Sequence, residues 1–273
     1  MGLRIRIRQT SSVPLEVEGL IPEALAQLSL KQIEQLKIFH GNASLSMAEF
    51  FDVDGDPSDE FVCWEGDLTG VHWIGTKMTR GSIRIEGNVG RHVGSEMRGG
   101  RIDVGGNVSD WVGAEMRGGE IVVAGNAGHL TGSAYRGSRR GMNGGTIVIR
   151  GNAGNEIGHT MRRGLIVIGG SIGDLAGMNM RAGTILVFGD CGIRHGAGMS
   201  RGTIGLWGPQ RPTLLPSYTY ACRMRPPVLS LLQRELDRFQ VAWPSHLRTG
   251  ECDLFHGDMV EGGRGEIWLP AIV

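Results

Sequence analysis

Two neighbouring stretches of the chain, MRGGRIDVGGNVSDWVG from Met97 to Gly113 and MRGGEIVVAGNAGHLTG from Met116 to Gly132, follow one pattern. Methionines at the same place in this pattern recur at steps of 19, 19, 26, 19, 19 and 19 residues, and the one long step contains a seven-residue insertion. The recurring methionines are Met78, Met97, Met116, Met142, Met161, Met180 and Met199. A fixed period is typical of a solenoid, in which each unit packs against its neighbours.

Each unit also contains two aliphatic residues separated by one position, which is the period of a half-buried β-strand. These pairs are Ile83/Ile85, Ile102/Val104, Ile121/Val123, Ile147/Ile149, Ile166/Ile168, Ile185/Val187 and Ile204/Leu206. A 19-residue unit is too short for a strand plus a packed helix, so successive strands should stack about 4.8 Å apart. The sequence predicts an all-β fold, a right-handed parallel β-helix of about seven to eight coils over residues 61–208.

Glycines and asparagines mark the corners of the expected coils. A glycine follows each strand and another lies seven residues later, where a corner needs a positive φ or a close backbone approach. Asparagine follows the first corner glycine at Asn88, Asn107, Asn126 and Asn152, with Asp67, Ser171 and Asp190 at the matching places. Asparagine tolerates left-handed backbone and can stack as an amide ladder, whereas the methionines are expected to fill the core.

The two flanking segments are expected to cap the stack, because its open ends would expose strand edges. Residues 1–60 form the N-terminal cap and entry segment, in which Ser29 and Gln32 have the spacing of a capping box and predict a short helix. Residues 209–273 form a C-terminal extension with one amphipathic helix that ends at Pro244. The apolar face of this helix consists of Leu229, Leu232, Leu236 and Phe239.

Composition excludes several classes of protein. The 28 basic residues balance the 28 acidic ones, which argues against a nucleic-acid partner held by a bulk positive field. The four cysteines are scattered without a C-x-x-C pair, so a structural zinc site is not expected. The charged start M-G-L-R-I-R-I-R and the lack of a long apolar run favour a cytoplasmic protein with no membrane partner.

No residues stand out as catalytic, cofactor-binding or metal-binding. Acidic residues such as Glu96 and Glu115 occupy repeat positions, which are usually structural. The corner histidines have different offsets: His92 is four residues past its asparagine, His129 three and His159 seven. They are therefore not expected to form one metal site.

Candidate partner contacts come from two sets of residues. Four arginines directly follow their methionines and should form a ladder, at Arg98, Arg117, Arg162 and Arg181. Such a stripe of like charge suits an acidic partner, although a solvated polar edge is an equal alternative. The insertion from Ser133 to Gly141 should project outward as an interface loop, or be a tolerated surface insertion. Its candidate contacts are Tyr135, Arg136, Arg139 and Arg140.

The chain resembles the C subunit of formylmethanofuran dehydrogenase and of its bacterial relative, the formyltransferase/hydrolase complex. The resemblance is carried by the M-R-G-G-x-I-x-V-x-G-N units, the G-N-x-x-x-x-x-x-x-F-F entry from Gly41 to Phe51, and the ending HGDMVEGGRGEI from His256 to Ile267. The coil segment alone is also similar to the C-terminal domain of the glutamate synthase large subunit. The Arg-rich surface with only three lysines, Lys31, Lys37 and Lys77, favours the bacterial complex.

The resemblance implies a non-catalytic scaffold subunit that itself binds no cofactor. Its partners would be amidohydrolase-like, formyltransferase and dehydrogenase-derived subunits, which carry zinc or, in archaeal forms, a molybdenum or tungsten pterin. The complex would handle formyl groups on methanofuran or methylofuran, linking formyl-tetrahydromethanopterin to formate, and the carrier's glutamate-rich tail is a second candidate contact for the arginines. Two alternatives stay open: the C subunit of a molybdenum or tungsten formylmethanofuran dehydrogenase, and a stand-alone polysaccharide enzyme.

Overall fold

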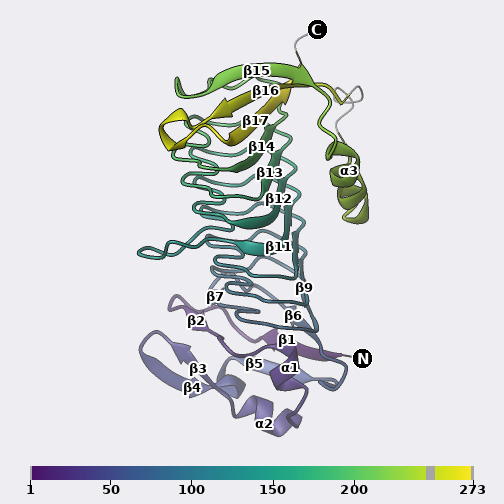
Figure 1. Cartoon of the computed structure of the whole chain (residues 1–273). Coiled ribbons are helices and arrows are strands. Elements are labelled where there is room, and N and C mark those ends of the chain that lie inside the picture. Colours follow the sequence, from purple (N-terminus) through teal and green to yellow (C-terminus); the bar gives the residue numbers. More distant parts are fainter. Residues whose placement is uncertain (1, 244–249, 272–273) are drawn as a thin grey trace.

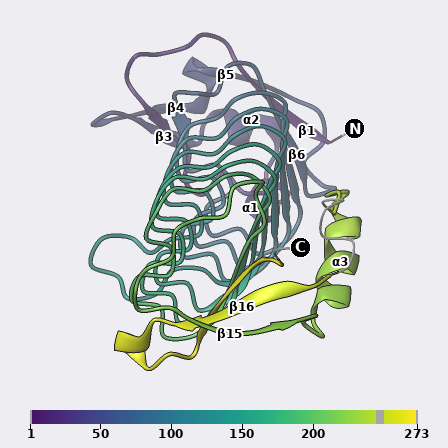
Figure 2. The same ribbon diagram turned by 90° about the horizontal axis from the view of Figure 1, so that it is seen from above.

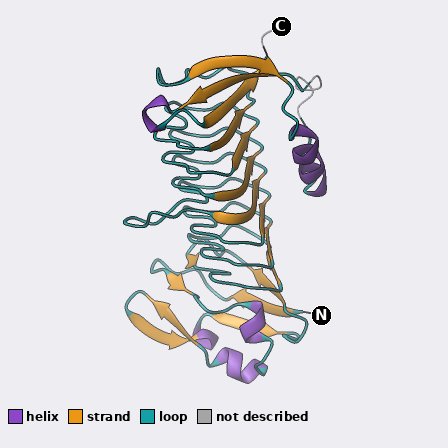
Figure 3. Ribbon diagram, viewed as in Figure 1, coloured by secondary structure: helices purple, strands orange, loops and turns teal. Residues whose placement is uncertain are grey.

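The computed structural model describes residues 2–243 and 250–271 and is mainly β, as expected (Figures 1 and 3). Its centre is a stack of coils whose strands pair in parallel, one coil to the next. The coil strands are β6 (Phe61–Glu65), β8 (Ser82–Ile85), β9 (Arg101–Val104), β10 (Glu120–Val123), β11 (Asn143–Ile149), β12 (Arg163–Ile168), β13 (Thr184–Val187) and β14 (Gly202–Leu206). The first of these coil strands, β6, starts at Phe61 and pairs in parallel with β8.

The 19-residue period sets the strand register. Ile102 pairs with Ile83 on one side and with Ile121 on the other, so identical positions of successive units lie side by side. These isoleucines and the repeat methionines are fully buried in one continuous core. Isolated parallel bridges, such as Val89 to Val108, link the coils again at a second wall. Each coil is therefore hydrogen-bonded to its neighbours at two walls of the stack.

Strands close the N-terminal end of the stack. Strand β1 (Leu3–Ile7) pairs in parallel with β6, and β5 (Phe51–Asp54) pairs antiparallel with β1. A smaller sheet contains β2 (Leu15–Glu16), β3 (Lys37–His40), β4 (Ala43–Ser46) and β7 (Val71–His72). The short helices are α1 (Pro22–Leu25), α2 (Leu30–Glu34) and the 3-10 turn η1 (Met47–Glu49). The predicted capping box of α2 is confirmed, with Ser29 N–H donating to Gln32 Oε1 at 2.8 Å.

The C-terminal end is also closed by strands. Strand β17 (Gly265–Pro270) pairs in parallel with β14, and β16 (Cys252–Gly257) and β15 (Thr219–Met224) follow antiparallel. The 3-10 turn η3 (Met259–Glu261) lies between β16 and β17. None of the described helices is long and apolar enough to span a bilayer.

The predicted C-terminal helix exists as α3 (Leu229–Arg238), but it does not cap the end of the stack. It lies beside the stack, along the outer face of the coil strands (Figures 1 and 2). Leu229, Leu236 and Phe239 are buried there in a second apolar cluster. Pro244, the expected end of this helix, lies outside the described residues.

The outward side chains of the strands explain where α3 lies. The outward position is polar on β8 and β9, with Arg84 and Asp103. From β10 onward it is apolar, because Val122 pairs with Val148 and the row continues to Val167 and Leu186. Burying one such side chain fully contributes about 1.5–3 kcal/mol. The helix therefore covers the part of the wall that would otherwise expose an apolar row.

Candidate partner interface

The asparagine corner forms the ladder that the sequence predicts. Asn107 N–H donates to Asn88 Oδ1 at 2.8 Å, and Asn126 N–H donates to Asn107 Oδ1 at 2.8 Å. The ladder continues through Asn152, Ser171 and Asp190 to Gln210. The expected left-handed backbone is wrong at this corner, because positive φ occurs at other positions of the coil, such as His92, Gly94, Glu96 and Gly100. These asparagines serve the coil backbone and are not free to bind a ligand.

The second corner carries another ladder, and two of the histidines belong to it. His129 N–H donates to Asp110 Oδ1 at 2.8 Å, and Asn155 N–H donates to His129 Nδ1 at 2.9 Å. His72 occupies the same place in an earlier coil and accepts from Arg91 N–H at 3.0 Å. The two histidines thus share a register, and both act as acceptors for backbone N–H groups. The described part of the chain contains no group of three or more His, Cys, Asp or Glu placed to hold a metal.

Next to this ladder lies a column of aromatic rings with left-handed backbone. Trp73, His92 and Trp111 occupy equivalent places in successive coils, with φ of 69°, 65° and 68°. The Trp73 and His92 rings stack at 3.9 Å between centroids and 6° between planes. The Trp111 ring lies 6.1 Å beyond His92. Stacked rings of this kind stabilise a fold beyond their buried area.

Tyr135 does not project from the insertion loop, which corrects the expectation for this residue. Its ring packs against the aromatic column, 5.0 Å from the Trp111 ring centroid. Its hydroxyl donates to the buried Ser95 Oγ at 2.8 Å and lies 3.0 Å from His92 Nδ1. Tyr135 therefore anchors the loop to coils that lie about 40 residues earlier in the chain.

The rest of the insertion does project, from the side of the stack away from α3 (Figures 1 and 2). Its base is closed by coil hydrogen bonds, in which Ala134 N–H donates to His159 O at 3.2 Å and Gly141 N–H to Thr160 O at 3.1 Å. Arg136, Arg139 and Arg140 are exposed, as predicted. The loop thus presents three cations from a base fixed in the stack.

The ladder arginines lie at equivalent places on their coils. Arg117 N–H donates to Met97 O at 2.7 Å, and Arg162 N–H donates to Met142 O at 2.8 Å. Asn143 occupies this place in the coil between them, so the ladder consists of two pairs rather than one run. The pairs are Arg98 with Arg117 and Arg162 with Arg181. This break lies at the coil that carries the projecting loop.

The charges around the ladder are only partly compensated. Arg117 lies 3.9 Å from Glu96, a long contact between side chains that are 49% and 27% exposed, so this ion pair contributes little. Arg162 Nη2 donates to the Arg139 carbonyl of the loop at 3.3 Å, while its Nε is buried without a hydrogen-bond partner. A hollow of about 220 Å³ lies between the projecting loop and the arginine ladder. It is lined by Glu115, Arg117, Ser138, Arg140, Gly141 and Asn143.

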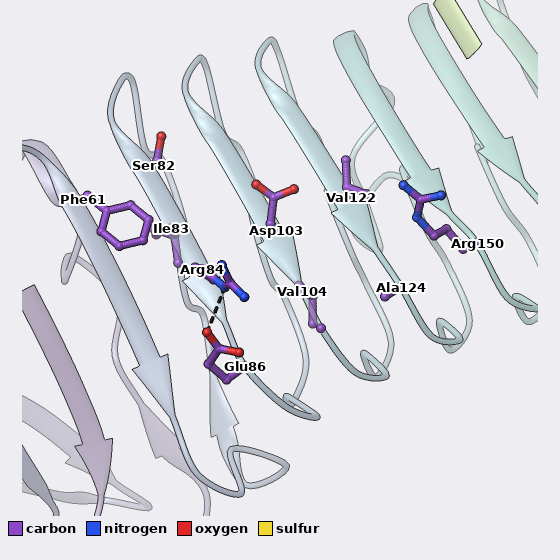
Figure 4. A pocket seen from close by; sticks show the side chains of 11 residues that line it. Phe61, Ser82, Ile83, Arg84, Glu86, Asp103, Val104, Val122, Ala124 and Arg150 are labelled. Atoms are coloured by element: carbon purple, nitrogen blue, oxygen red, sulfur yellow. Dashed lines mark ion pairs between the residues drawn. The ribbon is translucent and has the colours of Figure 1, made fainter. Parts of the chain in front are cut away.

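A larger hollow of about 430 Å³ lies on the outer face of the strands, in the polar region that α3 leaves uncovered (Figure 4). Arg84 forms a 2.8 Å ion pair with Glu86 there, Asp103 lies on the neighbouring strand, and Arg150 borders the other side. Arg150 is engaged, because it donates to the Phe239 carbonyl at 2.9 Å beyond the end of α3. This surface mixes both signs of charge and does not favour one class of partner.

The coil segment matches a known family model. Residues 70–213, more than half of the chain, fit the model described as "GXGXG motif". The chain belongs to the GXGXG-motif family. Together with the relatives described next, this match confirms the resemblance to the C subunit of formylmethanofuran dehydrogenase and of the formyltransferase/hydrolase complex.

One solved structure extends the similarity of this GXGXG-motif protein beyond the coils. A chain in the X-ray crystal structure of the formyltransferase/hydrolase complex (FhcABCD) from Methylorubrum extorquens, in complex with methylofuran, is 32% identical. The superposition has a TM-score of 0.91 and covers 98% of this chain and 100% of that chain. The flanking segments are therefore shared as well as the stack.

Curated relatives match the GXGXG-motif protein over a shorter stretch. The C subunit of the tungsten-containing formylmethanofuran dehydrogenase 2 of Methanothermobacter thermautotrophicus (strain Delta H) is 40% identical over 90 residues, which are 32% of this chain and 33% of the relative. The C subunit of the molybdenum-containing formylmethanofuran dehydrogenase 1 of the same organism is 43% identical over 91 residues, which are 33% of this chain and 23% of the relative. The matched stretch thus spans a third or less of these relatives.

The aromatic column of this family member should make its stability depend on pH. Burial, followed by the nearby His72 and Arg91 charges, lowers the pKa of His92 from 6.5 to about 4. The unfolded chain binds a proton on this ring near pH 6.5, whereas the folded protein resists protonation until about pH 4, so stability should fall as the pH drops through this interval. Urea denaturation at pH 7 and 4.5 should show a smaller loss for His92→Asn than for the wild type. Equal losses would contradict this role of His92.

The anchor of the loop can be tested with Tyr135→Phe. This change keeps the ring but removes the hydroxyl that meets Ser95 and His92, and should lower the free energy of unfolding by about 1–2 kcal/mol. Urea denaturation followed by tryptophan fluorescence reports on the adjacent Trp73 and Trp111. Tyr220→Phe is the matched control, because the Tyr220 side chain is 52% exposed, and it should change stability by less than about 0.5 kcal/mol.

Proposed function

We propose that this chain is the non-catalytic scaffold subunit, known as the C subunit, of a multi-subunit complex that transfers and hydrolyses formyl groups. The observation that carries the proposal is the end-to-end similarity to a chain of the FhcABCD complex, at 32% identity and a TM-score of 0.91. Similarity over the flanks as well as the coils supports a shared role in assembly, since a repeat alone would support only a shared fold.

The architecture suits a scaffold. We assign the stack to the right-handed parallel β-helix class, as the 19-residue parallel register supports. Side chains at two corners of most coils are engaged in hydrogen-bond ladders, which makes the walls rigid. In this proposal the partner contacts are the projecting loop with Arg136, Arg139 and Arg140, fixed by Tyr135, and the ladder pairs Arg98/Arg117 and Arg162/Arg181.

The proposal assigns the chemistry to other subunits of a cytoplasmic complex. Amidohydrolase-like, formyltransferase and dehydrogenase-derived partners would carry zinc and the methylofuran or methanofuran carrier, and this chain would bind neither. The alternative assignment is the C subunit of a molybdenum or tungsten formylmethanofuran dehydrogenase. The observation that supports this alternative is the identity of 40% and 43% to the two archaeal C subunits over about a third of the chain.

The deciding experiment is affinity purification of the full chain from its native host, followed by mass spectrometry. Stoichiometric recovery with an amidohydrolase-like subunit and a formyltransferase is the expected result. Recovery with a molybdopterin or tungstopterin subunit would favour the alternative. Recovery of the chain alone would overturn both assignments.

A further inference from the structure

The charge of the molecule is strongly divided along its length, although the whole chain is neutral. Residues 1–67 contain twelve acidic and five basic residues, a net charge of −7, and residues 68–273 contain sixteen acidic and twenty-three basic residues, a net charge of +7. The first group forms the N-terminal end of the stack (Figure 1). The remainder of the molecule is correspondingly cationic.

Most of the described arginines of this remainder that form no ion pair lie on one corner of the coils or on the loop that projects from it. The basic residues nearest the acidic end are paired, as with Lys77 to Glu18 at 2.8 Å and Arg80 to Glu60 at 2.9 Å. Eight arginines at the methionine corner make no ion pair within 4 Å to any residue that the structure describes. Together with Arg117 they form what we term the arginine edge: Arg98, Arg117, Arg136, Arg139, Arg140, Arg162, Arg163, Arg181 and Arg201.

Two hollows along the arginine edge are each flanked by two guanidinium groups. Arg117 and Arg140 flank the hollow of about 220 Å³, and Arg201 and Arg264 flank another of about 400 Å³. Each hollow also contains one carboxylate that is already engaged. Glu115 Oε1 accepts from Tyr135 N–H at 3.2 Å, and Glu266 Oε2 accepts from Trp268 Nε1 at 3.2 Å. Neither carboxylate lies within 4 Å of an arginine nitrogen in its own hollow, so among the described residues Arg140, Arg201 and Arg264 have no ion-pair partner and can bind external anions, while Arg117 has only the 3.9 Å contact with Glu96.

The spacing of the hollows indicates the shape of the ligand. They are three to four coils apart, or about 14–19 Å at one strand spacing per coil. An extended polypeptide covers this distance with about five or six residues. We propose that the arginine edge binds an extended acidic segment of a partner subunit, with one carboxylate in each hollow. This inference rests on the proposed function, because it identifies the kind of partner segment that the scaffold would bind.

A peptide-binding experiment tests the inference directly. The probe is fluorescein-labelled hexaglutamate with ordinary α-peptide bonds, and its binding to the full chain is followed by fluorescence anisotropy. We expect Arg140→Gln with Arg201→Gln, which removes one cation from each hollow, to weaken binding at least about tenfold at low salt. The matched control is Arg225→Gln with Arg234→Gln, two exposed arginines away from this edge, and it should change binding less than about twofold. Triglutamate, which cannot reach both hollows, should bind more weakly than hexaglutamate.

Several outcomes would overturn the inference: no binding of hexaglutamate, equal losses in the two double variants, or equal binding of triglutamate and hexaglutamate. Co-purification separates this inference from the proposed function. If the wild type recovers formyl-handling partners and Arg140→Gln with Arg201→Gln recovers them equally well, the arginine edge is not the contact but the scaffold assignment stands. If hexaglutamate binds as expected and the wild type recovers no such partners, the assignment fails while the anionic site stands.

Discussion

Replacing Gly119 with alanine is expected to lower the free energy of unfolding by at least about 3 kcal/mol. Gly119 has φ of +88°, and a Cβ atom there would lie 2.8 Å from the Gly100 carbonyl oxygen and 2.9 Å from the Gly99 carbonyl carbon of the previous coil. Both contacts are with backbone, so no side-chain movement can relieve them. Two neighbouring coils would have to separate locally, which would break ladder hydrogen bonds on both sides.

Gly137 provides the control for the Gly119 experiment. It has nearly the same φ, +86°, but lies in the projecting loop, where a Cβ would meet nothing within 4 Å. Gly137→Ala should therefore cost only the backbone strain, about 1–2 kcal/mol. Urea denaturation followed by circular dichroism measures both variants. If both variants lose the same free energy of unfolding, the close approach of the previous coil adds nothing to the backbone strain at position 119.

Replacing Leu236 with aspartate should detach α3 from the outer face of the strands. The Leu236 side chain is 1% exposed within the second apolar cluster, and a buried unpaired carboxylate there should cost about 3–5 kcal/mol. Because α3 lies outside the stack, we expect the helix to leave its position while the coils stay folded. Hydrogen exchange should then increase across residues 229–239, and an apolar dye should bind to the exposed Val122, Val148 and Val167.

Leu231 is the matched control on the same helix. Its side chain is 61% exposed, so Leu231→Asp introduces the same charge without burying it. Hydrogen exchange in α3 should be nearly unchanged. If Leu236→Asp instead unfolds α3 and the coils together, the helix is part of one cooperative unit with the stack and is not a separable cover.

Local repetition made much of the fold predictable. The aliphatic pairs identified every coil strand from β8 to β14, and the recurring asparagines identified their ladder, because both depend on residues one period apart. The position of α3 was missed, although the sequence contained a signal for it. The residue between each aliphatic pair changes from Arg84 and Asp103 to Val122, Val148, Val167 and Leu186, which indicates a wall that must be covered on both faces.

The candidate site was harder to predict than the fold. The exposure of Arg136, Arg139 and Arg140 follows from an insertion into a constant period. The inward position of Tyr135 does not, since it depends on rings contributed by Trp73, His92 and Trp111 in three earlier coils. The common register of His72 and His129 was missed because His129 was compared only with His92 and His159 by its distance from the asparagine, while His72 and His129 belong to the next corner.

The hydrogen bonds at the base of the insertion have a consequence for evolution. Ala134 and Gly141 keep their coil partners His159 and Thr160 although six residues intervene between them. The hydrogen bonds between coils at this corner therefore do not depend on the length of the inserted segment. A segment of different length and charge can be accommodated on the same two hydrogen-bonded ends, so the surface that such a stack presents at this corner can diverge while its coils stay constant.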